Sequence, residues 1–206
     1  MFGLFKSPPF HDPKLGELVR SRGLWRGSLT VEAGVSAPLT LSGTRTEPHA
    51  QALATAREVA QAFASWRPAI EQALFEHYEP YAEAVTAGEL PSPSEPLPRI
   101  AAPGDVWSHV SLVFVSVTPL SGLLTTELGY TTAWDDEHTL GARFQSGKFI
   151  ELCGSVLPPR RRRPTLPSSG PTSAHRRCGP DEKHLKRCLS RVMSAVLAMP
   201  AICPLL

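Results

Sequence analysis

The chain has 206 residues, a formal net charge of +2, 42% hydrophobic residues and four cysteines. This length suits one domain with a hydrophobic core, with or without an appendage. The cysteines form no CxxC pair and no Cys/His set with zinc-ligand spacing, which argues against a structural zinc site, so free thiols are expected.

The charge is unevenly distributed along the chain. Residues 1–157 hold 11 Lys and Arg against 17 Asp and Glu, a net charge of −6, whereas residues 158–206 hold 10 against 2, a net charge of +8. A run of prolines and arginines begins at this boundary. We therefore predict an α+β domain over residues 1–157, a disordered Pro/Arg/Ser-rich linker over 158–180, and an amphipathic basic helix or an unstructured tail over 181–199.

Neither end of the chain has the pattern of a targeting or membrane segment. The opening residues 1–6 are apolar but lack a basic leader, which is not typical of a secretory signal. The most apolar C-terminal run, residues 192–206, is shorter than the roughly 20 residues that a spanning helix needs. It is also broken by Pro200 and Pro204. The sequence therefore predicts a cytoplasmic protein without a transmembrane segment.

Within the N-terminal quarter, the spacing of hydrophobic residues changes from a helical to a strand-like pattern. Residues 14–22 place Leu15, Leu18 and Val19 on one side and predict a short helix. Residues 24–32 and 39–42 alternate apolar and small polar side chains around Gly34, which predicts a β-hairpin.

Residues 46–85 are the helical block, because their apolar residues recur at spacings of three and four. Pro68 interrupts this pattern and Pro80 lies near its far end, so we predict two helices or one kinked helix. His77 falls in the apolar stripe, where a core-edge histidine with a hydrogen-bonded ring is expected. The proline-rich residues 88–104 predict a surface loop.

The remaining domain is predicted to be sheet. Residues 106–117 are apolar on both alternating sets, as in a central strand covered on both faces. Residues 126–134 follow as a second strand. Residues 140–145 and 148–153 are joined by Ser146 and Gly147, a two-residue hairpin turn. This turn would place Ala142 opposite Glu151 and Leu140 opposite Cys153, leaving Glu151 as an acid on an otherwise apolar face.

Strands in runs rather than in alternation with helices indicate the α+β class. The predicted fold is an antiparallel sheet of about five to six strands with two helices packed on one face, plus a basic C-terminal extension. No G-x-S-x-G, G-x-G-x-x-G or P-loop motif occurs. A serine hydrolase of that type and the corresponding nucleotide enzymes are therefore unsupported.

The densest group of chemically capable side chains is the octet of residues 134–141, Trp-Asp-Asp-Glu-His-Thr-Leu-Gly. In a catalytic interpretation, His138 is a base and Asp135 or Glu137 orients its ring. In a metal interpretation, those three side chains hold a hydrated divalent ion. In a purely structural interpretation, Asp135 caps a turn, Trp134 packs on the sheet, Gly141 adopts a conformation that other residues avoid, and Glu137 and His138 pair in solvent.

The octet, followed by Arg143-Phe144, Gly147, Phe149, Glu151-Leu152 and Gly154-Ser155, resembles the W-D-x-E-H-x-x-G signature of uncharacterised bacterial domain families. The resemblance extends from the N-terminus, with Gly23-Leu24-Trp25 and Gly27, to about Leu157. It implies a small cytoplasmic protein with no established reaction and a loose association with toxin-immunity neighbourhoods. It also singles out Trp134, Asp135, Glu137, His138 and Gly141 as residues with a shared purpose.

These observations favour a non-enzymatic protein-binding module of the immunity type, whose acidic loop meets a protein partner and which needs no cofactor. The candidate functional residues are Trp134, Asp135, Glu137, His138, Gly141 and Glu151. The alternative is a metal-assisted hydrolase that uses Asp135, Glu137 and His138, with Glu151 as a further candidate.

The C-terminal tail matches nothing in the resembled families. Its basic residues could bind the acidic body or an anionic surface. The alternative is an unstructured extension, for which an altered reading frame is one explanation. The tail contains no aromatic residue for base stacking, which argues against nucleic acid as a partner.

Overall fold

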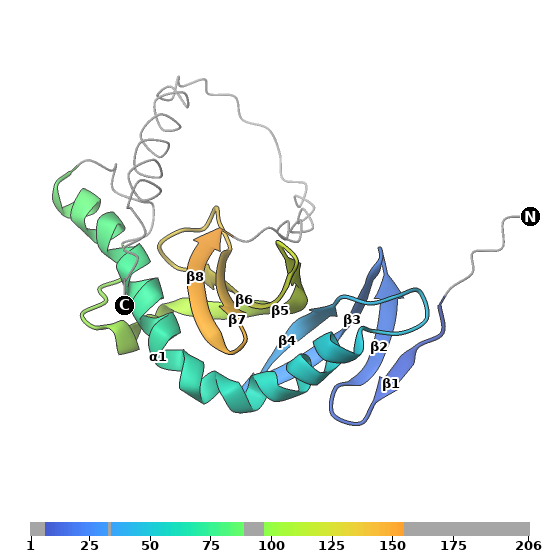
Figure 1. Cartoon of the computed structure of the whole chain (residues 1–206). Coiled ribbons are helices and arrows are strands. Elements are labelled where there is room, and N and C mark those ends of the chain that lie inside the picture. Colours follow the sequence, from blue (N-terminus) through green and yellow to red (C-terminus); the bar gives the residue numbers. More distant parts are fainter. Residues whose placement is uncertain (1–6, 33, 89–96, 155–206) are drawn as a thin grey trace, which may run out of the picture.

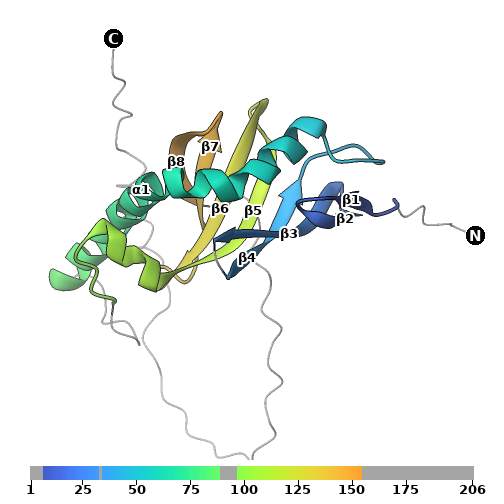
Figure 2. The same cartoon turned by 90° about the horizontal axis from the view of Figure 1, so that it is seen from below.

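A computed structural model describes residues 7–32, 34–88 and 97–154 of the protein (Figure 1). Within these residues eight strands form one open sheet in the order of the chain. The long helix α1 (Ala50–Thr86) lies across one side of this sheet (Figure 2). The mixed α+β class predicted from the sequence is therefore confirmed. The strands are β1 (Phe10–Asp12), β2 (Gly16–Ser21), β3 (Leu24–Glu32), β4 (Val35–Leu41), β5 (Val110–Leu120), β6 (Leu123–Thr132), β7 (Leu140–Gln145) and β8 (Lys148–Gly154).

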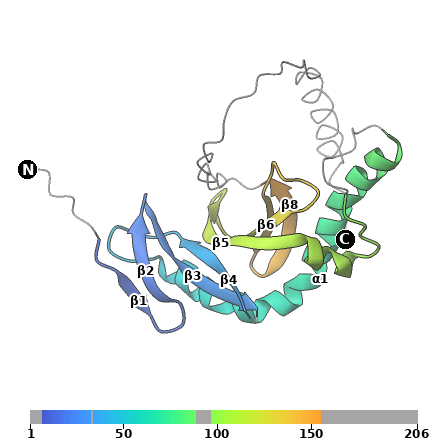
Figure 3. The ribbon, with the colours of Figure 1, turned by 180° about the vertical axis from the view of Figure 1, so that it is seen from behind.

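The first four strands are joined by short turns, and Figure 3 shows them side by side. The helix predicted over residues 14–22 is wrong, because this segment contains β2, which pairs with both β1 and β3. The β2–β3 turn has Arg22 at φ 51° and Gly23 at φ 85°. Two successive residues of positive φ are typical of the tight hairpin turn whose twist matches that of paired strands. Strand pairing thus overrides a helical spacing of only three apolar residues. The β3–β4 hairpin around Gly34 is confirmed.

The sheet has more strands than the predicted five to six, and it is not wholly antiparallel. Strands β4 and β5 pair in parallel through residues 39–41 and 115–117. A parallel pair needs a long crossover, and α1 with its following segment supplies it. The backbone N–H of Ser42 extends this short ladder by donating to Val117 O at 3.1 Å.

Helix α1 continues through 37 residues, including Pro68 and Pro80, and it curves along its length (Figure 1). No break separates two helices at Pro68, so of the two predicted alternatives for this block a single helix is the one found. Tertiary packing explains this outcome, because a buried stripe continues on both sides of the proline. The stripe comprises Ala52, Leu53, Ala56, Val59, Phe63, Trp66, Ile70, Leu74, Tyr78 and Ala84.

A second, shorter helix precedes β5. The 3-10 helix η1 (Pro103–His109) occupies the end of the predicted loop and the first residues of the predicted strand. Its Trp107 ring lies edge-on to Phe63 of α1 and to Tyr130 of β6, with centroids 6.0 Å apart in both cases. The guanidinium of Arg67 lies 4.8 Å from the centre of the Trp107 ring. Aromatic contacts therefore hold η1 between helix and sheet.

The β7–β8 hairpin forms at the predicted turn, with Phe144 opposite Phe149, but the register then shifts. Ile150 is an extra residue on β8, so that Glu151 lies opposite Arg143 and not opposite Ala142. The predicted pairs of Ala142 with Glu151 and of Leu140 with Cys153 are therefore wrong. A β-bulge moves every later side chain of a strand to the other face. Glu151 consequently does not lie on the apolar face.

None of the helices in the described residues combines the length and apolarity required to cross a lipid bilayer. The predicted linker over 158–180 and the predicted helix or tail over 181–199 lie outside the described residues, as does the proposal of an altered reading frame. Those statements remain predictions.

Candidate functional site

The acidic loop, defined as residues 133–139, joins β6 to β7 at one end of the sheet. It begins beside η1, where the N–H of Ala133 donates to His109 O at 2.9 Å. Its inner side faces the C-terminal half of α1, through contacts to His77 and Tyr81. The predicted connecting loop is therefore present, and the helix forms one of its walls.

Asp135 holds this loop in its conformation through hydrogen bonds. Its side chain is 5% exposed. Its Oδ1 atom accepts hydrogen bonds from the backbone N–H groups of Glu137 at 3.2 Å and His138 at 3.1 Å. The hydroxyl of Thr132 accepts a further hydrogen bond from the N–H of Asp135 at 3.1 Å. An aspartate that accepts from backbone N–H groups two and three residues ahead closes an Asx turn. The capping role expected from the sequence is thus confirmed.

The same carboxylate orients two aromatic side chains. The Tyr81 hydroxyl donates to Asp135 Oδ2 at 3.1 Å, and His138 Nδ1 lies 2.9 Å from Asp135 Oδ1. Burial, together with the nearby Asp135 and Glu137 carboxylates, raises the pKa of Tyr81, so this hydroxyl remains a donor. In the described part of the chain, no hydrogen bond reaches His138 Nε2. A half-exposed imidazole with one nitrogen held by a buried carboxylate can act as an oriented base or as a contact group.

Trp134 anchors the loop to the helix. It is 6% exposed and lies edge-on to Tyr78, with ring centroids 5.5 Å apart. Its indole N–H donates to His77 Nδ1 at 3.1 Å, so that nitrogen must be unprotonated. Burial lowers the pKa of His77, the neighbouring His138 lowers it further, and Asp135 opposes the shift. His77 is therefore the hydrogen-bonded core-edge histidine predicted from the sequence.

The outer side of the loop carries three consecutive exposed residues, Asp136, Glu137 and His138. The expected pairing of Glu137 with His138 in solvent is wrong, because the imidazole turns back onto Asp135. Within the described residues Glu137 has no ion pair, and its carboxylate faces outward. Two buried anchors and three exposed residues are thus combined in five consecutive positions.

Gly141 and Glu151 lie away from the loop, in a second group on the strands. Gly141 does not have the positive φ expected for it. A Cβ atom at Gly141 would instead lie 2.3 Å from Glu127 Oε1 and 2.9 Å from Glu127 Cδ. The glycine is required because the side chain of Glu127, on the neighbouring strand β6, lies directly over it.

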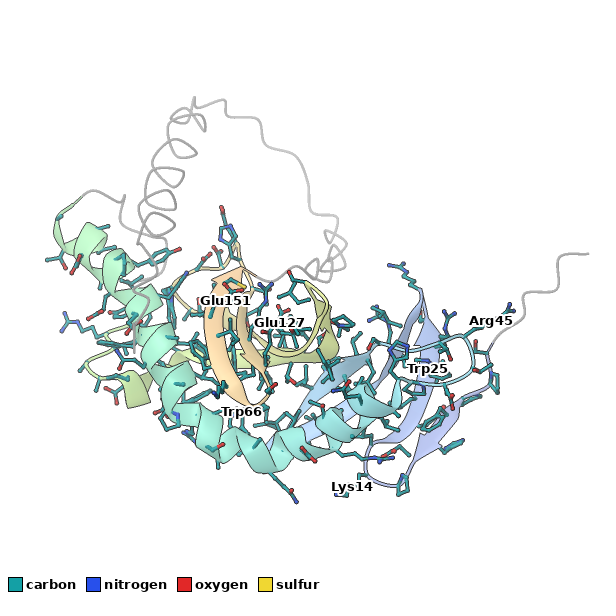
Figure 4. All side chains as sticks on the ribbon, in the orientation of Figure 1. Lys14, Trp25, Arg45, Trp66, Glu127 and Glu151 are labelled. Atoms are coloured by element: carbon teal, nitrogen blue, oxygen red, sulfur yellow. The ribbon has the colours of Figure 1, made fainter. Side chains whose placement is uncertain are left out.

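Glu127 belongs to a buried ionic cluster centred on Arg143, which is 7% exposed. Arg143 Nη1 donates to Glu151 Oε1 at 2.7 Å, and Arg143 Nε lies 3.5 Å from Glu127 Oε2. Figure 4 shows the two glutamates near each other in this part of the sheet. Within the described residues, Glu127 Oε1 and Arg143 Nε are buried without a hydrogen-bond partner. Burial raises the pKa of the adjacent Cys153 to about 11, which makes this free thiol unreactive.

The candidate metal ligands are only partly brought together. Asp135 and His138 are in contact, Glu137 faces outward, and Glu151 belongs to the Arg143 cluster. The described part of the chain contains no group of three His, Cys, Asp or Glu side chains arranged to hold a metal ion.

Sequence reasoning missed the contributions of Tyr81 and Glu127. A signal for Tyr81 was available, since it follows His77 by four residues in the same helical stripe. For Glu127 the signal was weaker. Glu127 and Gly129 are two positions apart on β6 and so lie on the same face of the sheet. Gly129 and Gly141 lie opposite each other on β6 and β7. Facing glycines in neighbouring strands indicate a close approach by larger side chains.

Residues 15–156 match the model of a family described as a domain of unknown function (DUF6985). The chain belongs to this family. The DUF6985 match includes every strand from β2 to β8, both helices, the acidic loop and the Arg143 cluster. The sequence-based assignment to a family of unknown function is therefore confirmed. Searches of curated proteins and of solved structures found no match.

Proposed function

We propose that this protein is a non-enzymatic protein-binding module of the bacterial cytoplasm, of the immunity type, and that its acidic loop contacts the partner. The observation that supports this proposal is the division of the loop into buried anchors and an exposed edge. Trp134 and Asp135 face inward, whereas Asp136, Glu137 and His138 are exposed. Such a loop presents charged side chains to a partner, while the residues that hold its conformation stay buried.

Preorganisation supports a binding role. A loop that must be ordered on association loses binding free energy for each side chain that becomes fixed. Here the backbone from residue 135 to residue 138 is already held by the Asp135 turn, and the His138 ring is already oriented. The partner surface is expected to be basic, because two adjacent carboxylates attract and orient positive charge.

The alternative function, a metal-assisted hydrolase, is supported by one observation. The contact between Asp135 and His138 Nδ1 leaves His138 Nε2 open as a base or a ligand. The Asp135 carboxylate, however, already accepts from two backbone N–H groups and from Tyr81. Thermal shift of the full chain with Mg²⁺, Mn²⁺ and Zn²⁺, alongside His138→Gln, tests this function. Stabilisation that is lost in the variant would support the hydrolase, and no shift with any ion would remove it.

Affinity capture with the tagged full chain tests the binding role. The variant Asp136→Asn/Glu137→Gln removes two exposed charges without altering the buried anchors. The control Glu17→Gln/Glu47→Gln removes two exposed charges elsewhere. We expect a co-purifying protein to be retained by the native chain and by the control, and to bind about tenfold more weakly to the loop variant. Equal retention by both variants, or no retained protein, would contradict the proposal.

A further inference from the structure

A groove of about 590 Å³ runs between the first half of α1 and the end of the sheet where β6 starts and β7 ends. Its helical wall is one flank of α1, with lining residues spaced three and four apart from Gln51 to Trp66. Its other wall comes from the start of β6 and the end of β7. This volume lies within the range of ligand-binding pockets, which is roughly 300–1,000 Å³.

Trp66 and Phe144 lie beneath the groove, are 8% and 2% exposed, and are fixed in place. Trp66 stacks on Phe144 with ring centroids 4.3 Å apart. The indole N–H of Trp66 is already used, since it donates to Gly147 O at 3.1 Å. Figure 4 shows Trp66 between α1 and the β7–β8 hairpin. At the mouth, Leu123 is 60% exposed, and Leu124 is partly buried. A ligand with an apolar body would cover this surface.

The rim selects the charge of the ligand. Glu58 is the one charged residue among the described lining residues, and within the described chain it forms no ion pair. The described lining residues include no lysine, arginine or histidine to balance it. An anion would therefore be repelled, whereas a cation would gain an unused carboxylate partner.

From these observations we infer that the groove binds a small organic ammonium compound, with its apolar body against Leu123 and the exposed edge of Trp66 and its charged nitrogen at Glu58. This site is independent of the proposed function. Glu58 and Tyr81 are 23 residues apart on the same helix, which is roughly 35 Å along its axis. A ligand in the groove therefore does not touch the acidic loop.

The test uses three probes that share a phenylethyl or benzyl body and differ in charge: phenethylamine, 2-phenylethanol and phenylacetate. Binding to the full chain is followed at low ionic strength by saturation-transfer and ¹H–¹⁵N NMR titrations. We expect phenethylamine to bind about three- to fivefold more tightly than 2-phenylethanol, and phenylacetate to bind most weakly. Glu58→Gln should remove the preference for the amine, and the control Glu47→Gln, which neutralises an exposed carboxylate elsewhere, should keep it.

Ala62→Phe fills the groove and should abolish binding of all three probes, with circular dichroism used to check its fold. If that variant does not fold, Leu123→Ser removes the apolar mouth without adding charge and should weaken all three probes. Three results would overturn the inference. The first is equal affinity for the three probes, and the second is an unchanged amine preference in Glu58→Gln. The third is no binding of phenethylamine up to 10 mM, a Kd that corresponds to about 2.7 kcal/mol of binding free energy.

Discussion

Two acidic side chains are buried within ten residues of each other in the chain, and the protein stabilises them differently. Asp135 accepts hydrogen bonds from backbone N–H groups of its own loop and from Tyr81. Glu127 lies over a glycine on the next strand and depends on Arg143, while its Oε1 atom has no hydrogen-bond partner in the described chain. The first acid is satisfied by local structure, and the second depends on the alignment of three strands.

This difference predicts how each region responds to mutation. A carboxylate that accepts several hydrogen bonds within one loop depends on neutral donors, and the loss of one such hydrogen bond has a modest cost. A buried ion pair that loses one member leaves an uncompensated charge in the interior, which is far more costly. The strand cluster should therefore control stability, and the loop should control binding.

The largest effect is expected for Arg143→Met, which leaves Glu127 buried without a counter-charge. We expect the free energy of unfolding to fall by about 4 kcal/mol, measured by urea denaturation with circular dichroism. Glu151→Gln removes the exposed partner of the same arginine and should cost about 1 kcal/mol or less. Equal losses in the two variants would show that Glu127 is not the residue that needs Arg143.

Gly141→Ala should be the next most damaging change. Its new Cβ atom would lie 2.3 Å from Glu127 Oε1, so the carboxylate must shift, and its ion pair with Arg143 is disturbed. Overpacking of this kind costs about 1–3 kcal/mol in unfolding experiments. The control Gly154→Ala meets no atom within 4 Å and should be nearly neutral. In the background of Glu127→Ala the cost of Gly141→Ala should largely disappear, and an undiminished cost would refute the close-approach explanation.

A smaller loss, about 1.5 kcal/mol, is expected for Asp135→Ala, because the loop loses the acceptor of its turn. Asp135→Asn keeps one acceptor oxygen and should cost less than the alanine variant. Both variants should weaken partner retention in the capture experiment, since the exposed edge would no longer be held. If the Asp135→Ala chain is destabilised but still retains the partner fully, the Asp135 turn is not needed for binding.

The smallest effect concerns pH. His77 must be unprotonated at Nδ1 to accept from Trp134, and its pKa is lowered in the folded state. The unfolded chain therefore binds a proton more readily than the folded one, and stability should decline as the pH falls below about 6.5. His77→Gln keeps an acceptor that does not titrate. Melting temperatures measured between pH 5 and 8 should show a shallower decline in this variant, and identical pH profiles would contradict the assignment.

Sequence patterns predicted the features that depend on neighbouring residues. The Asp135 turn, the Ser146-Gly147 hairpin turn and the buried helical stripe each follow from spacings within a few positions. The features that were mispredicted depend on distant pairing. Strand β2, which was predicted to be a helix, needs β1 and β3 as partners. The spacing around Pro68 left two alternatives open, and the buried stripe on both sides of that proline decides for one helix.

The candidate site follows the same distinction between local and distant contacts. The turn-capping role of Asp135 was predicted from the loop alone. Trp134 was expected to pack on the sheet, whereas its hydrogen bond and ring contact are to His77 and Tyr78 of α1, and Gly141 and Glu151 were misassigned. One extra residue in β8 places Glu151 opposite Arg143, and no local pattern marks a bulge at that position. The role of Gly141 depends on a side chain 14 positions away in the sequence.

The bulge at Ile150 also bears on self-association. Among the described strands, β8 is the last of the sheet and pairs on one side only. A regular outer edge would invite further strands from other molecules, which is how ordered aggregates begin. Ile150 makes the hydrogen-bonding groups of this edge irregularly spaced, and the exposed Lys148 adds a charge beside them. Both features disfavour pairing with a strand of another molecule. Deleting Ile150 would restore an even ladder and should make the protein prone to fibril growth.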